Sequence, residues 1–304
     1  MTTSIETSPA AERFALGVRA NATFFQTVTM LFKLRIVALL LFAGMGGAFL
    51  AARGWPGLAP LVLMTLTGGS AAAGASALNQ YLERDTDAAM RRTRRRPLVV
   101  GAIIHPSWVL SIGLALVFLP PLVVLPFHPA LAFWSLAGAV MYVGVYTIWL
   151  KPRSILNIVI GGLAGTCAVF SGGAAVGNWN QPAVIVLGLL VFLWTPAHFW
   201  SLAMMYREDY ARVGMPMLPV RTSMRRSALW VTLHAAATGF AACAIGVAAA
   251  VGWPYWLPVV LLTSGMLWRC ARLTAEPTPA RARSLFLWLN VYLTAVILLI
   301  CVAG

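Results

Sequence analysis

The chain has 304 residues, of which 60% are hydrophobic and only 10% are charged. Soluble domains are typically about 45–50% apolar and about 25% charged, so this chain has too few charged side chains to cover a water-soluble globule. Its formal net charge is +14, but the basic residues fall in loops between apolar segments. This pattern is typical of membrane topology rather than of nucleic-acid binding, and it predicts an all-α, polytopic membrane protein.

The predicted elements begin with a mixed polar N-terminal segment, residues 1–33, which shows no signal-peptide pattern. Within it, residues 14–32 are predicted to form an amphipathic helix on the membrane surface, so the segment is cytoplasmic or interfacial. A spanning helix needs about 20 mostly apolar residues. Nine such stretches follow, and they form a single predicted transmembrane domain over residues 34–304. The predicted spans are residues 34–52, 57–82, 107–126, 129–150, 154–176, 181–206, 228–251, 254–272 and 284–303.

Two of these spans, 57–82 and 154–176, are rich in glycine, alanine and serine. Small residues let helices approach closely in lipid, so close packing is the first interpretation. The second interpretation is a wall of the bundle that is shaped around a bulky ligand.

Basic residues occur at alternate connections along this layout, and all of them except Arg53 fall on the side of the N-terminus. The positive-inside rule therefore places the N-terminus in the cytoplasm and the C-terminus outside. The lack of a transit-type N-terminus favours the inner membrane of a bacterium over an organellar membrane.

Acidic residues are scarce, and one group of them lies at the end of the second span. If the helix continues through this region, Asn79, Glu83 and Asp87 fall at i, i+4 and i+8 and share one helix face. Such oxygen donors suit Mg²⁺, which bridges protein carboxylates to substrate phosphates. The arginine-rich residues 91–96 follow directly, and guanidinium groups match phosphate oxygens. The pattern predicts a Mg²⁺–diphosphate site, although the positive-inside rule alone also explains the arginines.

A second group lies at the cytoplasmic end of span six, where Glu208 and Asp209 follow the only histidine placed inside a span beside charged residues, His198. A histidine in a membrane helix is either a satisfied core residue or a functional one. Three aromatic residues accompany it: Trp194, Phe199 and Trp200. We interpret most of them as interface residues, and the alternative is that they stabilise a cationic intermediate.

The first motif resembles the Asn-x-x-x-Asp-x-x-x-Asp motif of the UbiA superfamily of intramembrane prenyltransferases. Further stretches resemble the branch of that superfamily that modifies haem: 92–93, 96–98, 146–151, 157–162, 194–200, 209–210 and 216–219. The resemblance runs from about Lys33 onward, and nine spans agree with the fold of that family. Three features depart from its pattern: Glu83 stands where aspartate is usual, residues 33–35 lack a central proline, and residues 221–226 lack the usual glycine-bearing pattern.

The resemblance implies transfer of a farnesyl group from farnesyl diphosphate to a vinyl group of haem B, with water adding, to give haem O for terminal oxidases. It implies that Mg²⁺ is held by Asn79, Glu83 and Asp87, and that Asp209, with Glu208, holds a second ion or orients Lys151. Three residues would bind the diphosphate: Arg92, Arg96 and Lys151. His198 would ligate the haem iron, bind a propionate or deliver water. The candidate catalytic residues are Asn79, Glu83, Asp87, Asp209 and His198.

Two alternatives remain open. One is a UbiA-type prenyltransferase that acts on an aromatic or quinone acceptor. The other is a transporter or a non-catalytic oxidase-assembly protein, which would place acidic groups near the bilayer midplane rather than at one face. The expected partners are farnesyl diphosphate, haem B and the lipid bilayer, with haem A synthase or oxidase-assembly factors as protein partners and no nucleic acid.

Overall fold

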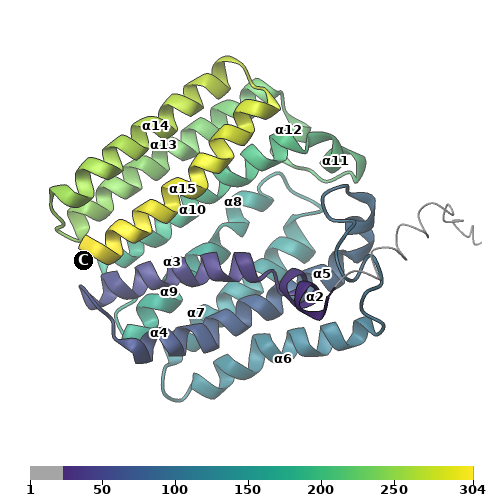
Figure 1. Ribbon diagram of the computed structural model, residues 1–304, viewed down its shortest axis with the longest axis horizontal. Helices are drawn as coiled ribbons and strands as arrows, with labels where there is room; N and C mark the ends of the chain where they lie inside the picture. Colours follow the sequence, from purple (N-terminus) through teal and green to yellow (C-terminus); the bar gives the residue numbers. More distant parts are fainter. Residues whose placement is uncertain (1–22, 304) are drawn as a thin grey trace, which may run out of the picture.

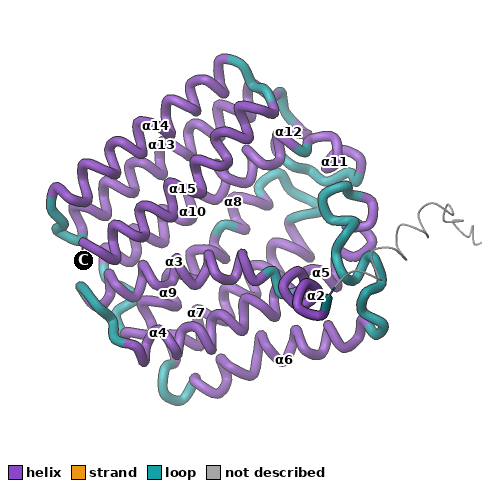
Figure 2. Tube along the Cα trace, in the orientation of Figure 1, coloured by secondary structure: helices purple, strands orange, loops and turns teal. Residues whose placement is uncertain are grey.

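The computed structural model describes residues 23–303, and within them the chain forms helices and loops without a strand (Figure 2). The expected all-α membrane protein is confirmed, because eight helical segments are long and apolar enough to cross a membrane. They are α3 (Leu34–Ala52), α4–η1–α5 (Leu58–Met64, Thr65–Gly69, Ser70–Ala89), α6 (Pro106–Val124), α7–η2 (Pro129–Val140, Met141–Leu150), α8–α9 (Asn157–Gly161, Leu163–Val176), α10 (Pro182–Met205), α13 (Met224–Ala248) and α15 (Pro279–Ala303). The short helices are α2 (Phe24–Leu31), α11 (Arg207–Arg212) and α12 (Leu218–Arg221).

The ninth expected span, residues 254–272, coincides with helix α14 (Trp253–Ala275), which is not among these eight. Its first turns hold prolines and aromatic residues, and its last turns hold Arg269 and Arg272, so its sequence is less apolar. In the bundle α14 nevertheless packs against α13 and α15 and runs beside them (Figure 1). The described chain therefore has eight spans by composition and a ninth helix that shares their arrangement.

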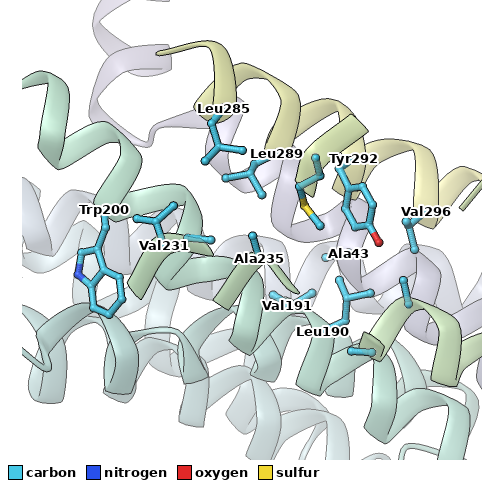
Figure 3. Close-up of a cluster of buried hydrophobic side chains, with 14 of the residues drawn as sticks. Ala43, Leu190, Val191, Trp200, Val231, Ala235, Leu285, Leu289, Tyr292 and Val296 are labelled. Carbon is cyan, nitrogen blue, oxygen red and sulfur yellow. The ribbon is translucent and has the colours of Figure 1, made fainter. Parts of the chain in front are cut away.

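Helices α10, α13, α14 and α15 form one part of the bundle, and α3 to α9 form the other (Figure 1). Figure 3 shows the core of the first part, where α15 directs apolar side chains toward α10 and α13. The residues on α15 are Leu285, Leu289, Tyr292 and Val296, and those facing them include Leu190, Val191, Val231 and Ala235. Helix α3 contacts both parts, and it brings Ala43 into the same cluster.

Helices α3 and α9 cross at a distance that only glycine permits. A Cβ atom added at Gly172 would lie 1.7 Å from the carbonyl oxygen of Gly44, and one at Gly47 would lie 2.2 Å from that of Val169. Both atoms belong to the facing backbone, which cannot turn away as a side chain can. The close-packing interpretation of the small residues is thus confirmed for this crossing.

Replacing Gly172 by valine is expected to separate α3 from α9, because backbone atoms block the new side chain on the facing helix. We expect the detergent-purified variant to unfold at a lower temperature than the parent, or to fail to accumulate in the membrane. Gly144→Val is the matched control for bulk, since the nearest atom to its added Cβ, Val140 Cγ1, lies at 3.9 Å and its backbone has no positive φ. Equal melting temperatures for Gly172→Val and the parent would contradict the crossing geometry.

The predicted surface helix is described in part. Helix α2 covers Phe24–Leu31 with Thr23 and Phe32 as its caps, and residues 14–22 lie outside the described residues. The Gln80 side-chain amide donates to the carbonyls of Met30 and Leu31 at 2.7 and 2.8 Å, which fixes α2 against α5. Helices α2, α11 and α12 lie at one end of the bundle, and the C-terminus lies at the other (Figure 1).

Candidate active site

Helix α5 carries the predicted oxygen donors on a buried face. The second span continues as a helix to Ala89, well beyond the expected end at residue 82, and this extension includes Glu83 and Asp87. Asn79, Glu83 and Asp87 are 2%, 9% and 3% exposed, whereas Asp85 on the opposite face is almost fully exposed. The predicted alignment of the three residues on one helix face is therefore observed.

Basic side chains from two other segments meet these carboxylates. Lys151, directly after η2, pairs with Glu83, and Arg96 pairs with Asp87. The Arg96 guanidinium also lies 4.0 Å from Glu83, so one cation spans both acids. Thr93 donates to the Asp87 carbonyl at 3.0 Å and holds the arginine loop against the helix end. Two of the predicted diphosphate ligands, Arg96 and Lys151, thus lie beside the predicted metal ligands.

Lys33 joins the same cluster, although the sequence pattern did not single it out as a site residue. Its ammonium group donates to Asn79 Oδ1 at 2.6 Å and to the Tyr142 hydroxyl at 2.9 Å. Its backbone has φ 49° and ψ 48°, a left-handed conformation that costs a non-glycine residue about 1–3 kcal/mol. Burial lowers the pKa of Lys33 well below its usual value, with Arg96 acting in the same direction and Glu83 opposing it. Strain and desolvation together indicate a functional position.

Lys151 experiences the same environment. Burial lowers the pKa of Lys151, and its ion pair with Glu83 opposes that effect. Both lysines lie over aromatic rings of η2, Lys33 at 5.5 Å from the Tyr142 centroid and Lys151 at 5.6 Å from that of Tyr146. The two tyrosine rings are stacked at 5.9 Å. The cluster therefore combines buried positive and negative side chains, and its two lysines lie over the tyrosine rings.

The second predicted acidic group is arranged differently. Glu208 is exposed, and Asp209 is buried with its carboxylate 3.4 Å from the Arg212 guanidinium. The residue that faces the first cluster from α11 is Tyr210. Burial raises the pKa of Tyr210, and a hydrogen bond with Arg92 opposes the rise. The structure thus connects the third predicted diphosphate ligand, Arg92, to α11 through Tyr210, and the metal roles of Glu208 and Asp209 stay predictions.

A cavity of about 300 Å³ extends from the cluster into the bundle. Ser76, one turn below Asn79, lines it together with Tyr142 and Tyr146. Further along, its wall is made of small residues from η1, α5, α7 and α9, including Gly68, Ala72, Gly138 and Gly165. The second interpretation of the small residues is thus observed as well, since they shape a cavity in addition to packing helices.

His198 lies on the opposite wall of this cavity. Its ring is stacked between Trp194 at 4.3 Å and Phe286 at 4.5 Å, and its buried Nδ1 has no hydrogen-bond partner within the described residues. Nearby polar side chains on this wall belong to Thr195 and Asn290. The imidazole therefore lines an apolar cavity while one of its ring nitrogens is buried and unpaired.

The interpretation of the aromatic residues as interface residues is wrong for Trp194 and Trp200. Trp194 donates to the Leu289 carbonyl at 2.8 Å and lines the cavity, and Trp200 is buried against His234. Both project from the inner face of α10, which packs on α13 and α15. An interface residue must face lipid headgroups, which these positions do not.

The oxygen donors of α5 fit a hard divalent cation in kind and burial. Two carboxylates and an amide oxygen lie on consecutive turns of α5. Among the described residues, no three or more acidic, histidine or cysteine side chains come together as a metal site. In this arrangement the oxygens are paired with Lys33, Lys151 and Arg96. A metal ion would therefore bind these oxygens only after the three basic side chains had moved away from them, toward a bound anion.

The sequence matches the UbiA prenyltransferase family over residues 39–292. It is 41% identical to the protoheme IX farnesyltransferase of Metallosphaera sedula over 288 residues, which cover 94% of this chain and 98% of that protein. It is 38% identical to the protoheme IX farnesyltransferase of Streptomyces coelicolor, over 98% of this chain and 95% of the relative.

Solved structures share the fold at lower identity. A structure of digeranylgeranylglyceryl phosphate synthase superposes with a TM-score of 0.77 and 16% identity, covering 92% of this chain and 98% of its own. A UbiA homologue from Archaeoglobus fulgidus bound to DMAPP and Mg²⁺ has a TM-score of 0.65 and 16% identity, covering 91% of this chain and all of its own. The helical arrangement is therefore that of intramembrane prenyltransferases.

Proposed function

Because the chain belongs to the UbiA prenyltransferase family, and within it to the protoheme IX farnesyltransferases, we propose that it transfers the farnesyl group of farnesyl diphosphate to haem B. The C1–O bond breaks and its electron pair leaves with the diphosphate. Farnesyl C1 bonds the terminal vinyl carbon of haem B, water adds to the other vinyl carbon, and a proton is released. The product carries a hydroxyethylfarnesyl side chain, as in haem O.

The observation that carries the proposal is a buried cluster of cations and acids beside an apolar cavity, joined to it by Tyr142 and Tyr146. Departure of diphosphate requires that its growing negative charge be neutralised in a water-poor site. Lys33, Lys151 and Arg96 supply positive charge there, and Arg92 interacts with the nearby Tyr210. Mg²⁺ held by Asn79, Glu83 and Asp87 would supply further Lewis-acid stabilisation of the leaving group. A similar fold is seen with Mg²⁺ and DMAPP in the Archaeoglobus fulgidus homologue, which supports this assignment.

The cavity would protect the farnesyl cation after the diphosphate has left. A farnesyl cation reacts with water unless it is shielded, and the wall of glycine, alanine and aromatic residues excludes water. The ring faces of Tyr142 and Tyr146 lie between the charged cluster and the cavity, where they stabilise positive charge. Asp209 and Glu208 of α11 would act on a second ion or would orient Lys151.

We assign His198 to the haem. Its stacked ring lies among apolar groups rather than beside cations, so binding of an anionic propionate is disfavoured and iron coordination is favoured. Delivery of water to the vinyl carbon is the remaining role. The protein would lie in a bacterial inner membrane with its N-terminus and site cytoplasmic, and haem A synthase or oxidase-assembly factors would act on its product.

His198→Ala is expected to change the optical spectrum of bound ferric haem B, because it removes a strong-field nitrogen ligand. The measurement is the Soret and visible spectrum of haem added to purified protein, with imidazole rescue of the variant. His234→Ala is the matched control, since His234 packs against Trp200 and lies outside the cavity wall. Identical haem spectra in His198→Ala and the parent would overturn the iron assignment.

The reaction is tested with protein in lipid nanodiscs, farnesyl diphosphate, Mg²⁺ and haem B. Mass spectrometry should find farnesyl hydroxyethyl haem, with one diphosphate released per product. Prenylation of 4-hydroxybenzoate instead of haem would favour a quinone-type acceptor. Failure to consume farnesyl diphosphate with either acceptor would favour a transporter or an assembly protein.

A further inference from the structure

A tryptophan, Trp134, lies toward the end of the cavity that is remote from the charged cluster. Trp134 lines the cavity, as does Tyr142 on the same helix. The two residues are separated by about 12 Å along the axis, from the rise of 1.5 Å per residue. Tyr142 bonds Lys33 and so marks the charged end, while Trp134 marks the other. The lining residues of η1, α5 and α9 along this stretch are small, whereas those of α3 are mostly large and apolar, so the arm runs along the small-residue side toward Trp134.

Trp134 is held in place from three directions. Its ring lies 4.9 Å from Phe133, 4.7 Å from Phe170 and 5.0 Å from Trp179, with edge-on or tilted contacts. Met64, which also lines the cavity, belongs to the buried cluster that packs against Trp134. A side chain fixed in this way cannot swing aside at low cost to admit a longer ligand.

Given the proposed function, we propose that Trp134 sets the length of the isoprenoid that the enzyme accepts. The main chain of a farnesyl group is roughly 14 Å long when extended, from C–C bonds of about 1.5 Å. That length agrees with the distance from the tyrosine rings to Trp134. A geranylgeranyl group is one isoprene unit longer, and its last unit would meet the indole ring. The walls set the width of the arm, and Trp134 sets its depth.

The test is binding of the unreactive thiolodiphosphates of farnesol and geranylgeraniol, which measures chain length without turnover. The parent should bind the farnesyl compound at least tenfold more tightly, and Trp134→Ala should reduce that preference to threefold or less. Trp149→Ala is the matched control, because Trp149 is 59% exposed on the same helical segment and does not line the cavity. An unchanged preference in Trp134→Ala would overturn the proposal.

A second variant changes the cavity in the opposite direction and does not remove the aromatic cluster. Gly68 lines the cavity, and a Cβ added there meets no atom closer than the Ser135 hydroxyl oxygen at 3.6 Å, so a side chain fits without a clash at its first atom. Gly68→Leu should shorten the arm and raise the preference for geranyl over farnesyl thiolodiphosphate at least fivefold. No change in that ratio would contradict a length limit in this arm. The haem product assay on the parent reports the proposed function separately, so the two failures are distinguishable.

Discussion

Asp87→Ala is expected to lower the rate of farnesyl transfer at least 10²-fold, which is the size of effect seen when one preorganised electrostatic group is removed from an active site. Asp87 is 3% exposed and pairs with Arg96, and it is a proposed ligand of the metal that neutralises the leaving group. The measurement is product formation by purified protein at saturating Mg²⁺, with insertion into the membrane checked separately. Undiminished output would defeat the metal assignment.

The control separates catalysis from folding. Removing one partner of a buried ion pair costs about 3–5 kcal/mol, and Asp87→Ala removes the nearer of the two carboxylates that contact Arg96, so the variant also loses stability. Asp87→Asn keeps the shape and a hydrogen-bond acceptor, and we expect it to insert normally and remain inactive. Asp85→Ala is the matched exposed variant on the same helix, since the Asp85 side chain is 95% exposed, and it should retain full activity.

The spacing of the first motif predicted its geometry correctly because an α-helix repeats every 3.6 residues. Asn79, Glu83 and Asp87 need only a continuous helix to share a face, and α5 provides it. Basic residues close in sequence to that helix, such as Arg96, were also within reach of the argument. Local periodicity and short connections therefore sufficed for the half of the site that lies within twenty residues of Asn79.

The other half depends on non-local packing. Tyr142 and Tyr146 lie in an apolar run on η2, where the chain forms a π-helix, as the bond from the Lys151 amide to the Tyr146 carbonyl shows. A wheel drawn with 3.6 residues per turn assigns the wrong face to such a segment. The inner position of Trp194 and Trp200 likewise follows from which face of α10 packs on α13 and α15, and their residue type alone also suits an interface.

The sequence did not identify Lys33 as a site residue, and the reason is a different one. A single basic residue just before an apolar span is what the positive-inside rule predicts at any cytoplasmic helix start, so its type and place carry no further signal. Its left-handed backbone and its contacts with Asn79 and Tyr142 appear only in three dimensions. The division between an N-terminal segment and a membrane domain at residue 33 stays a prediction, and Lys33 contributes to the site from that boundary.

Lys33→Met is expected to lower kcat/KM for farnesyl diphosphate about 10²-fold, the typical loss for one charge-assisted donor in an active site. Methionine matches the length of the side chain and removes only the ammonium group that bonds Asn79 and Tyr142. Because the buried charge is costly without an anion beside it, the substrate-free variant should be as stable as the parent or more so. A merely structural lysine would show the opposite pattern, with lower stability and little change in kcat/KM.

The matched variants complete the argument. Arg35→Ala removes an exposed cation two residues away and should leave kcat/KM unchanged, so a general loss of local positive charge is not the cause. Lys33→Arg retains the charge but replaces a compact ammonium with a planar fork, and it should recover only part of the activity because the pocket between Asn79 and Tyr142 fits a single point donor. If Lys33→Met and Arg35→Ala lowered kcat/KM equally, binding of the diphosphate would depend on the total positive charge at this end of the bundle, and the specific role of Lys33 would be contradicted.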